Sequence, residues 1–259
     1  MEIVGRVESV WRYPVKSMRG EELHEAFAGF GGVYGDRLYA FRSSAAPKGF
    51  PYLTGREQQQ MLLYQPVYSD PELMAKPPNL AEADAISPNI APVYPAAAQV
   101  MVHVRTPDGE MLAIDDPLLA NLLHEAHELT LLRSDRAMTD CRPLSLFSIQ
   151  TARQLSQDMG ADLDKRRFRA NVYLDIGSQN AFEEDQFVGR TLRIGAKAQI
   201  AVLDRDSRCK MITLDPDTGE ANPEVMRHLA RSRDGKAGVY AAVLVEGMIR
   251  PGDEIALLN

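Results

Sequence analysis

Short strand-like runs, each bounded by turn residues, recur along nearly the whole chain and restrict it to a β-rich fold. The runs are rich in β-branched and aromatic residues, which suit the pleated surface of a sheet. They cover residues 6–13, 36–42, 61–68, 100–105, 111–114, 144–147, 169–176, 191–194, 199–203, 239–245 and 254–258. Many short strands with few helices favour a closed or partly closed barrel. We therefore expect a β-rich α+β protein with a few short helices.

Three segments carry the signals of a helix start. Asp116 is a suitable N-cap before Pro117, and Asn222 stands in the same way before Pro223. Ser148 can cap a third helix, which a glycine would end. We expect a short helix after each of these caps.

The domain organisation follows from a loop and a boundary. Residues 71–95 hold six prolines with little periodicity, which indicates a long irregular loop. The helix signal at residue 116 marks the boundary. We expect an N-terminal β domain over residues 1–115. A helical connector and a second β domain should follow over residues 116–259.

Charge and cysteine content exclude several classes of protein. The chain has 259 residues and a formal net charge of −7, which disfavours binding to nucleic acid or to an acidic membrane surface. No apolar run is long enough to cross a membrane, and residues 1–7 resemble a strand rather than a signal peptide. Two cysteines, Cys141 and Cys209, are too few for a disulfide framework and suit a reducing compartment. We therefore expect a cytoplasmic protein.

The segment from Ser207 to Gly219 is the first candidate for chemistry. Arg208 stands directly before Cys209, and a neighbouring cation favours the thiolate, the form that ligates soft metals or attacks electrophiles. The sequence Asp-Pro-Asp-Thr-Gly at residues 215–219 then forms a rigid turn. Two interpretations stay open here, because most lone cysteines are simply small buried hydrophobic residues.

Further cations stand at turn positions in this acidic chain. They are Lys16, Arg37, Lys165, Arg166, Arg167 and Arg169. Each alone is typical of a solvated surface, but together with a thiolate they could hold an anionic, sulfur-bearing cofactor. No phosphate-binding glycine loop, dinucleotide fingerprint or Cys-x-x-Cys pair is present. Nucleotides, structural zinc and iron–sulfur clusters therefore have no support.

Short motifs follow one another in a fixed order along the chain. They are Tyr-Pro-Val-Lys-Ser at 13–17, Gly-Asp-Arg at 35–37, Leu-Thr-x-Arg at 53–56, Phe-Arg-x-Asn at 168–171, Phe-x-Glu-Asp at 182–185, Arg-Cys at 208–209, the turn at 215–219 and Gly-x-Ile-x-x-Gly-Asp at 247–253. This ordered set resembles the MOSC-domain proteins, specifically the amidoxime-reducing branch with an N-terminal MOSC β-barrel domain. The resemblance implies an N-terminal β domain, a C-terminal MOSC β-barrel and a molybdenum cofactor in the cleft between them.

The resemblance also implies roles for individual residues. Cys209 would be the protein ligand to molybdenum and the catalytic residue. The residues implied to bind the molybdopterin are Lys16, Ser17, Arg37, Asp140, Cys141, Arg169, Asn171, Ser207 and Arg208. Two departures from the family pattern stand out: Ala170 replaces a proline, and Phe187 stands near a position that is commonly tryptophan. Asp215 and Asp217 are candidate proton donors, although turn formation alone also explains both.

The reaction that the resemblance implies is the two-electron reduction of N-hydroxylated compounds to N–H compounds and water. The sequence has no nicotinamide, flavin or iron–sulfur signature, so the electrons should come from a separate flavin or iron–sulfur protein. Two alternatives remain. One is a sulfur carrier or sulfurtransferase that uses a Cys209 persulfide, and the other is a non-catalytic protein that binds molybdenum cofactor.

Overall fold

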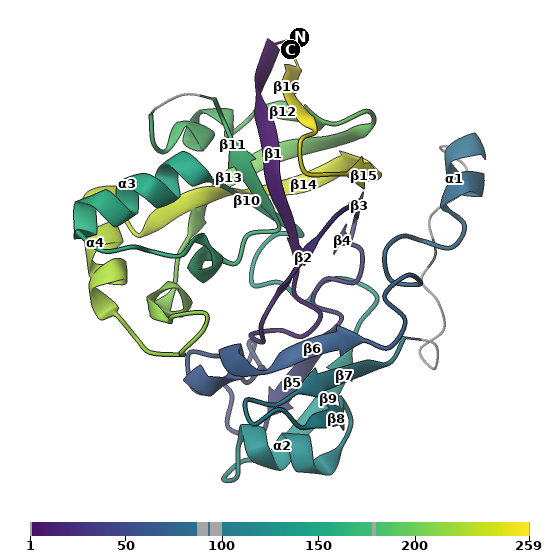
Figure 1. Cartoon of the computed structure of the whole chain (residues 1–259), viewed down its shortest axis with the longest axis vertical. Helices are drawn as coiled ribbons and strands as arrows, with labels where there is room; N and C mark the ends of the chain where they lie inside the picture. The colour runs from purple at the N-terminus through teal and green to yellow at the C-terminus, as the bar shows by residue number, and fades with distance from the viewer. Residues whose placement is uncertain (1, 87–92, 94–99, 178–179, 259) are drawn as a thin grey trace.

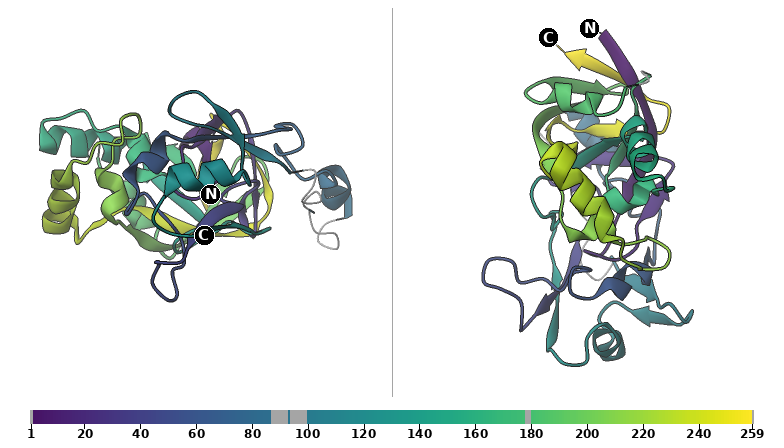
Figure 2. Two further views of the ribbon diagram at one scale, coloured as in Figure 1. Left: turned by 90° about the horizontal axis from the view of Figure 1, so that it is seen from below. Right: turned by 90° about the vertical axis from the view of Figure 1, so that its left-hand side faces the viewer.

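The computed structural model describes residues 2–86, 93, 100–177 and 180–258. A barrel with helices at its side occupies one end of the long axis, and a smaller β-rich lobe occupies the other (Figure 1). The first and last strands of the chain lie side by side at the barrel end (Figures 1 and 2). Among the residues described, no helix has the length and apolar character that a membrane crossing needs.

Seven strands close into the barrel. In order around the ring they are β1 (Glu2–Arg12), β11 (Val172–Asp175), β10 (Leu144–Ser148), β14 (Lys236–Val245), β13 (Ala198–Ser207), β12 (Thr191–Ile194) and β16 (Glu254–Leu258). β16 then pairs with β1, so the first strand of the chain closes a ring that is otherwise made by the second half. β10 and β11 run parallel and are joined through α3 (Ile149–Met159).

The barrel interior holds one apolar cluster, to which strands from both ends of the chain contribute side chains. Val10, Leu146, Val172, Ile200 and Val239 come from five strands and are fully buried in it. Burial of a large apolar side chain stabilises the fold by about 1.5–3 kcal/mol. This packing fixes β1 within the barrel, and it thereby fixes the start of the loop that follows β1.

The smaller lobe is built from two antiparallel sheets and two short helical segments. Its elements are β5 (Tyr39–Ser43) paired with β9 (Leu129–Arg133), the meander β6 (Gln65–Tyr68), β7 (Val102–Arg105) and β8 (Met111–Ala113), the 3-10 turn η1 (Gln59–Leu63) and α2 (Pro117–Leu123). They share a second apolar cluster that contains Leu38, Met61, Val102 and Leu119.

Short strands link the two parts of the molecule. β15 (Gly247–Ile249), β3 (Ala26–Gly29) and β4 (Gly32–Val33) form a three-stranded sheet, and β2 (Glu21–Leu23) extends the edge of β1. β15 comes from the last part of the chain, yet its partner β3 comes from the first. The two halves of the sequence are therefore interleaved in space.

Helices and 3-10 turns pack on one side of the barrel. They are α3, α4 (Pro223–Arg233), η3 (Lys165–Phe168), η4 (Glu183–Phe187) and η5 (Lys210–Thr213). All of them except η4 contribute to a third apolar cluster. The side chain of Ser148 caps α3 by accepting from Thr151 N at 3.1 Å. That of Asn222 caps α4 by accepting from Glu224 N at 3.1 Å.

Most sequence predictions of secondary structure are confirmed, including the caps at Asp116, Ser148 and Asn222. The predicted loop over 71–95 is wrong in part, because α1 (Leu80–Ile86) forms once the early prolines are passed; residues 87–92, 94 and 95 lie outside the described part. Residues 61–63 belong to η1 rather than to a strand. The β-rich fold with a closed barrel and few short helices is confirmed, whereas the boundary at 115/116 stays a prediction.

Candidate functional site

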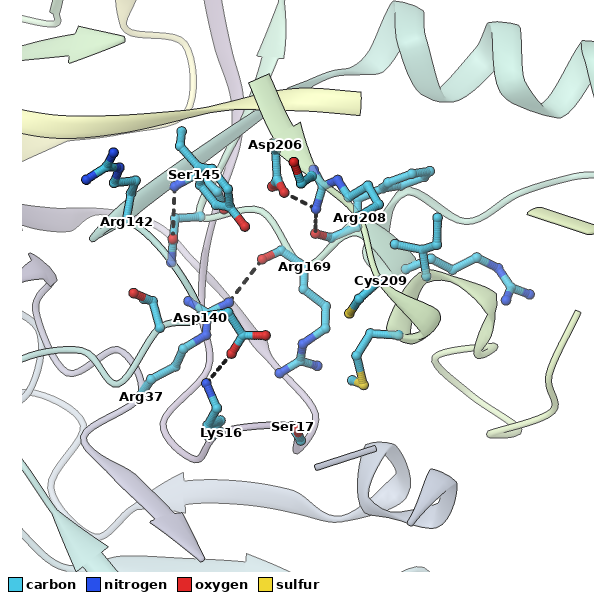
Figure 3. A pocket seen from close by; sticks show the side chains of 18 residues that line it. Lys16, Ser17, Arg37, Asp140, Arg142, Ser145, Arg169, Asp206, Arg208 and Cys209 are labelled. Atoms are coloured by element: carbon cyan, nitrogen blue, oxygen red, sulfur yellow. Dashed lines mark hydrogen bonds and ion pairs between the residues drawn. The ribbon is translucent and has the colours of Figure 1, made fainter. Parts of the chain in front are cut away.

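A polar pocket opens where loops from distant parts of the chain meet (Figure 3). It contains about 780 Å³ of space not filled by protein atoms, its open mouth included. The residues that line it are Lys16, Ser17, Arg37, Thr139, Asp140, Arg142, Ser145, Arg167, Phe168, Arg169, Asn171, Asp206, Ser207, Arg208, Cys209, Met211, Ile212 and Tyr240. We call it the cationic pocket.

The cationic pocket brings together every predicted site residue except Cys141. Cys141 is an exposed free cysteine outside the lining, whereas its neighbour Asp140 forms part of the wall. The roles of the lining residues in binding or catalysis stay predictions.

Three lining residues adopt a left-handed backbone conformation. Ser17, Arg37 and Arg169 have φ angles of 66°, 46° and 51°. They are three of the five non-glycine residues with positive φ in the described part of the chain. Such a conformation costs about 1–3 kcal/mol and persists only where the surrounding structure enforces it. The fold therefore holds these side chains in place against the local preference of the backbone.

The buried ring of Tyr13 supports two of the guanidinium groups. The guanidinium carbon of Arg37 lies 4.6 Å from the ring centre, and that of Arg169 lies 4.3 Å from it. Arg37 also forms an ion pair with the fully buried carboxylate of Asp36. Burial lowers the pKa of Arg169 to about 10, and the like charge of Arg37 adds to this effect. Arg169 nevertheless stays charged at neutral pH.

Lys16 lies almost fully buried in the wall beside Asp140. Its Nζ donates to the carbonyl oxygen of Met138 at 2.8 Å and forms an ion pair with Asp140. Burial lowers the pKa of Lys16, and the carboxylate of Asp140 offsets part of this shift. Burial alone would raise the pKa of Asp140, but the ammonium of Lys16 outweighs it and holds that pKa below its usual range. Asp140 therefore partly compensates the charge of Lys16.

Arg208 is fixed by backbone groups at the end of β13. Its Nε donates to Ala237 O at 2.7 Å, and its Nη1 donates to Phe168 O at 2.8 Å. Nη1 also pairs with the buried carboxylate of Asp206 at 2.9 Å. Gly238, with φ of 76°, leaves room for this group, because a Cβ there would lie 2.9 Å from Nη2 of Arg208. These bonds fix the segment that carries Cys209.

Among the residues described, three buried guanidinium nitrogens of arginines that line the pocket lack a hydrogen-bond partner: Nε of Arg167, Nη2 of Arg169 and Nη2 of Arg208. A buried donor without an acceptor costs roughly 1–3 kcal/mol. Six cationic side chains line the pocket (Lys16, Arg37, Arg142, Arg167, Arg169 and Arg208), against two carboxylates (Asp140 and Asp206). This arrangement fits an anionic ligand with several acceptor oxygens, such as a phosphate.

Cys209 adds a thiol to this cationic setting. It is a free, partly buried cysteine at the N-cap of η5, and its side chain points into the pocket (Figure 3). In the ranges that the structure describes, no group of three or more His, Cys, Asp or Glu side chains could hold a metal ion.

Asn171 has a structural task in addition to its place in the wall. Its Nδ2 donates to Trp11 O at 3.3 Å, and its Oδ1 accepts from Ser145 N at 3.4 Å. The buried amide therefore ties β1 to β10.

The aspartates of the 215–219 turn also have structural partners. Asp215 accepts from the backbone N–H groups of Asp217 and Thr218 at 3.0 and 3.1 Å, and pairs with Arg167 at 2.7 Å. Asp217 pairs with Arg166 at 2.5 Å. These bonds explain both aspartates without a role in proton transfer.

Sequence reasoning missed part of the lining. Thr139, Arg142 and Asp206 are sequence neighbours of predicted residues, so adjacency was the available signal. Ser145 and Tyr240 lie inside strands, where nothing in the local sequence marks them. Their position in the wall depends on how the barrel closes.

Comparisons with known proteins place both parts of the chain. The MOSC N-terminal beta barrel domain matches residues 4–127, and the MOSC domain matches residues 133–256. Mitochondrial amidoxime reducing component 2 of Bos taurus is 24% identical over 237 residues, which are 85% of this chain and 69% of that protein. Molybdenum cofactor sulfurase of Drosophila pseudoobscura pseudoobscura is 36% identical over 97 residues, which are 37% of this chain but 12% of the sulfurase.

Two solved structures are also similar. The YUAD protein of Bacillus subtilis has a TM-score of 0.45 at 13% identity, over 97% of this chain and 93% of that one. YiiM of Geobacillus stearothermophilus has a TM-score of 0.37 at 20% identity, over 46% of this chain and 55% of that one. Since the two domain matches together span residues 4–127 and 133–256, the chain belongs to the MOSC-domain proteins that carry an N-terminal MOSC β-barrel domain.

Proposed function

We propose that the chain is a molybdenum-cofactor-dependent oxidoreductase that reduces N-hydroxylated compounds. The observation that carries this proposal is the cationic pocket, where one cysteine lies among six cations and three guanidinium nitrogens have no partner in the described chain. An anionic group that brings its own metal ligands satisfies both features. The likeness to an amidoxime reducing component supports the class of reaction.

Some residues of the pocket would hold the cofactor, and the surrounding fold orients those residues. Lys16, Ser17, Arg37 and Arg169 would bind its phosphate and ring system, and Cys209 would bind its metal as a soft thiolate ligand. When bound, the cofactor supplies the two-electron redox chemistry. The surrounding fold keeps the cations oriented before the ligand arrives, so that little ordering cost remains on binding.

The proposed reaction consumes two electrons and two protons. The N–O bond of the substrate breaks, the nitrogen gains hydrogen, and the oxygen leaves as water. The sequence carries no signature of a nucleotide, flavin or iron–sulfur site. A separate flavin or iron–sulfur protein would therefore deliver the electrons through a small, transient contact. We also propose a cytoplasmic location, because the sparing use of cysteine suits a reducing compartment.

Sulfur transfer is the second candidate, favoured by the match to molybdenum cofactor sulfurases over 97 residues. In that case Cys209 would carry a persulfide and no metal would bind. A non-catalytic protein that binds the cofactor is a third candidate, with the same pocket but no turnover.

The test uses protein made in a host that synthesises the cofactor. Molybdenum is quantified, and the reduction of benzamidoxime is measured with a chemically reduced viologen dye as electron donor. Stoichiometric molybdenum with benzamidine formation supports the proposal. Full loading without turnover favours a binding protein, and transferable sulfur without molybdenum favours sulfur transfer. NADH or NADPH alone should give no turnover until a reductase is added.

A further inference from the structure

A second hollow shares Cys209 with the cationic pocket and lies at the start of α4. The apolar residues Ala221, Pro223 and Met226 form much of its lining. Its cavity volume is about 370 Å³, which is within the range of small-molecule sites. We call it the apolar hollow.

The walls of the apolar hollow are held by hydrogen bonds and packing. The backbone N–H of Asn222 donates to Thr213 O at 2.8 Å, and the Asn222 side chain caps α4. Ala221 forms a β-bridge with Leu214, and Met226 packs against the apolar cluster beneath α4. The hollow is therefore part of the folded structure and does not need a ligand to form.

Two cations stand at the exposed edge of this hollow. Lys210 donates from Nζ to the carbonyl oxygen of Arg56 at 3.0 Å. This acceptor is uncharged, so the bond does not neutralise the ammonium group. Arg227 forms an ion pair with Glu224. The edge thus has two positive charges against one negative charge, and it disfavours a positively charged ligand.

We propose that the apolar hollow binds the hydrocarbon group of the N-hydroxylated substrate while the N–OH group lies beside Cys209. This inference rests on the proposed function and names the substrate class. The substrate is an amidoxime or related compound whose aryl or branched alkyl group ends in a neutral or negatively charged substituent. Cys209 lines both the hollow and the cationic pocket, so the two sites adjoin at this residue. Burial of the hydrocarbon against the apolar walls supplies the binding free energy.

The test compares benzamidoxime with acetamidoxime, which has only a methyl group, using the cofactor-loaded protein and a reduced viologen dye. Ala221→Phe fills the hollow from an exposed position. We expect it to lower kcat/KM for benzamidoxime by about tenfold or more, mainly through KM, and to change that for acetamidoxime by less than about twofold. Ala230→Phe makes the same substitution at an exposed site of α4 outside the lining and should change neither.

A binding measurement separates this inference from the proposed function. Saturation-transfer NMR of benzamidoxime on the cofactor-free protein should show contact with its aromatic protons, and Ala221→Phe should remove that signal. Met226→Ala enlarges the hollow and should shift the preference of the loaded protein toward a naphthyl amidoxime. If the loaded protein reduces both substrates and Ala221→Phe alters neither turnover nor the NMR signal, the hollow is not the substrate site and the proposed function stands. If the loaded protein reduces neither substrate, the proposed function is wrong, and the NMR result alone supports or overturns the hollow.

Discussion

Arg37 donates a hydrogen bond from Nη2 to the backbone carbonyl of Arg169 at 3.1 Å, although 132 residues separate the two. Both guanidinium groups also lie against the ring of Tyr13. The bond uses the side chain of Arg37 but only the backbone of Arg169, whose Nη2 has no partner among the residues described. Arg37 therefore fixes the pocket wall, and the guanidinium of Arg169 is available to a ligand.

Arg169→Met and Arg208→Met should separate ligand binding from stability. Arg169→Met should change the stability of the cofactor-free protein by about 1 kcal/mol or less, equivalent to about 2–4 °C in Tm, while molybdenum content falls strongly. Arg208→Met removes two backbone hydrogen bonds and leaves Asp206 buried without its partner, so it should cost about 3–5 kcal/mol. Thermal unfolding of both cofactor-free variants and metal analysis after loading provide the test. Unchanged molybdenum in Arg169→Met would remove this arginine from the site.

Cys209→Ala and Cys141→Ala should differ sharply. Cys209 lines the cationic pocket, whereas Cys141 is exposed outside it. Cys209→Ala should fold normally but lose molybdenum and reductase activity, because the metal loses its thiolate ligand. Cys141→Ala should keep both. Metal content and viologen-coupled turnover are the measurements, and an equal loss in both variants would mean that the two cysteines act together.

Asn171→Ala should weaken the fold as well as the site. The variant removes the amide that joins Trp11 O of β1 to Ser145 N of β10, and it leaves both groups buried without that partner. We expect a loss of about 1–3 kcal/mol in the free energy of unfolding, measured by urea denaturation of the cofactor-free protein. Asn171→Asp keeps the acceptor for Ser145 N but puts a buried oxygen where the donor to Trp11 O stood, so it should not restore the stability. A stable Asn171→Ala variant that fails only in cofactor binding would show that Asn171 acts on the ligand directly.

Glu184→Gln should change the pH dependence of stability. The carboxyl group of Glu184 is fully buried, and burial raises its pKa above the ordinary value of 4.5, although bonds from Ser148 and Thr151 offset part of the shift. A group with a raised pKa in the folded state binds its proton more tightly there than in the unfolded state. Its stabilising contribution is present below pH 4.5 and is lost as the pH rises through the folded-state pKa.

The free energy of unfolding of the wild type, relative to Glu184→Gln, should therefore fall as the pH is raised above about 4.5. Urea denaturation at several pH values measures the difference. Glu220→Gln, at an exposed position, serves as the control and should follow the wild type. Parallel curves for the wild type and Glu184→Gln would mean that the buried carboxyl does not titrate in this range.

Local causes made part of the fold predictable. The caps at Asp116, Ser148 and Asn222 depend on a few neighbouring residues, and the structure has all three. Such local signals could not predict which distant segments pair in a sheet. β3 and β15 are only four and three residues long, and each is defined by the other across the chain.

The candidate site was also predictable only in part, because some of its residues reach it through long-range strand pairing. Motif resemblance identified residues such as Lys16, Arg169 and Cys209, and packing brings them to one pocket. Tyr240 lies inside a strand and reaches the wall only because β14 pairs with β10 and β13. Cys141 follows Asp140 in sequence but lies outside the lining, since the ion pair with Lys16 orients Asp140 and not its neighbour.

The pairing of β1 with β11 and β16 sets an order of events during synthesis. β1 leaves the ribosome first, yet neither of its barrel partners exists until the second half of the chain has been made. Domains generally fold as units during translation, but this barrel has to wait for its last strand. The loop that carries Lys16 and Ser17 pairs with Tyr39 of the smaller lobe, but its position relative to Cys209 also depends on β1 in the closed barrel. Cofactor insertion should therefore come after translation of β16 and act on a chain that has already folded.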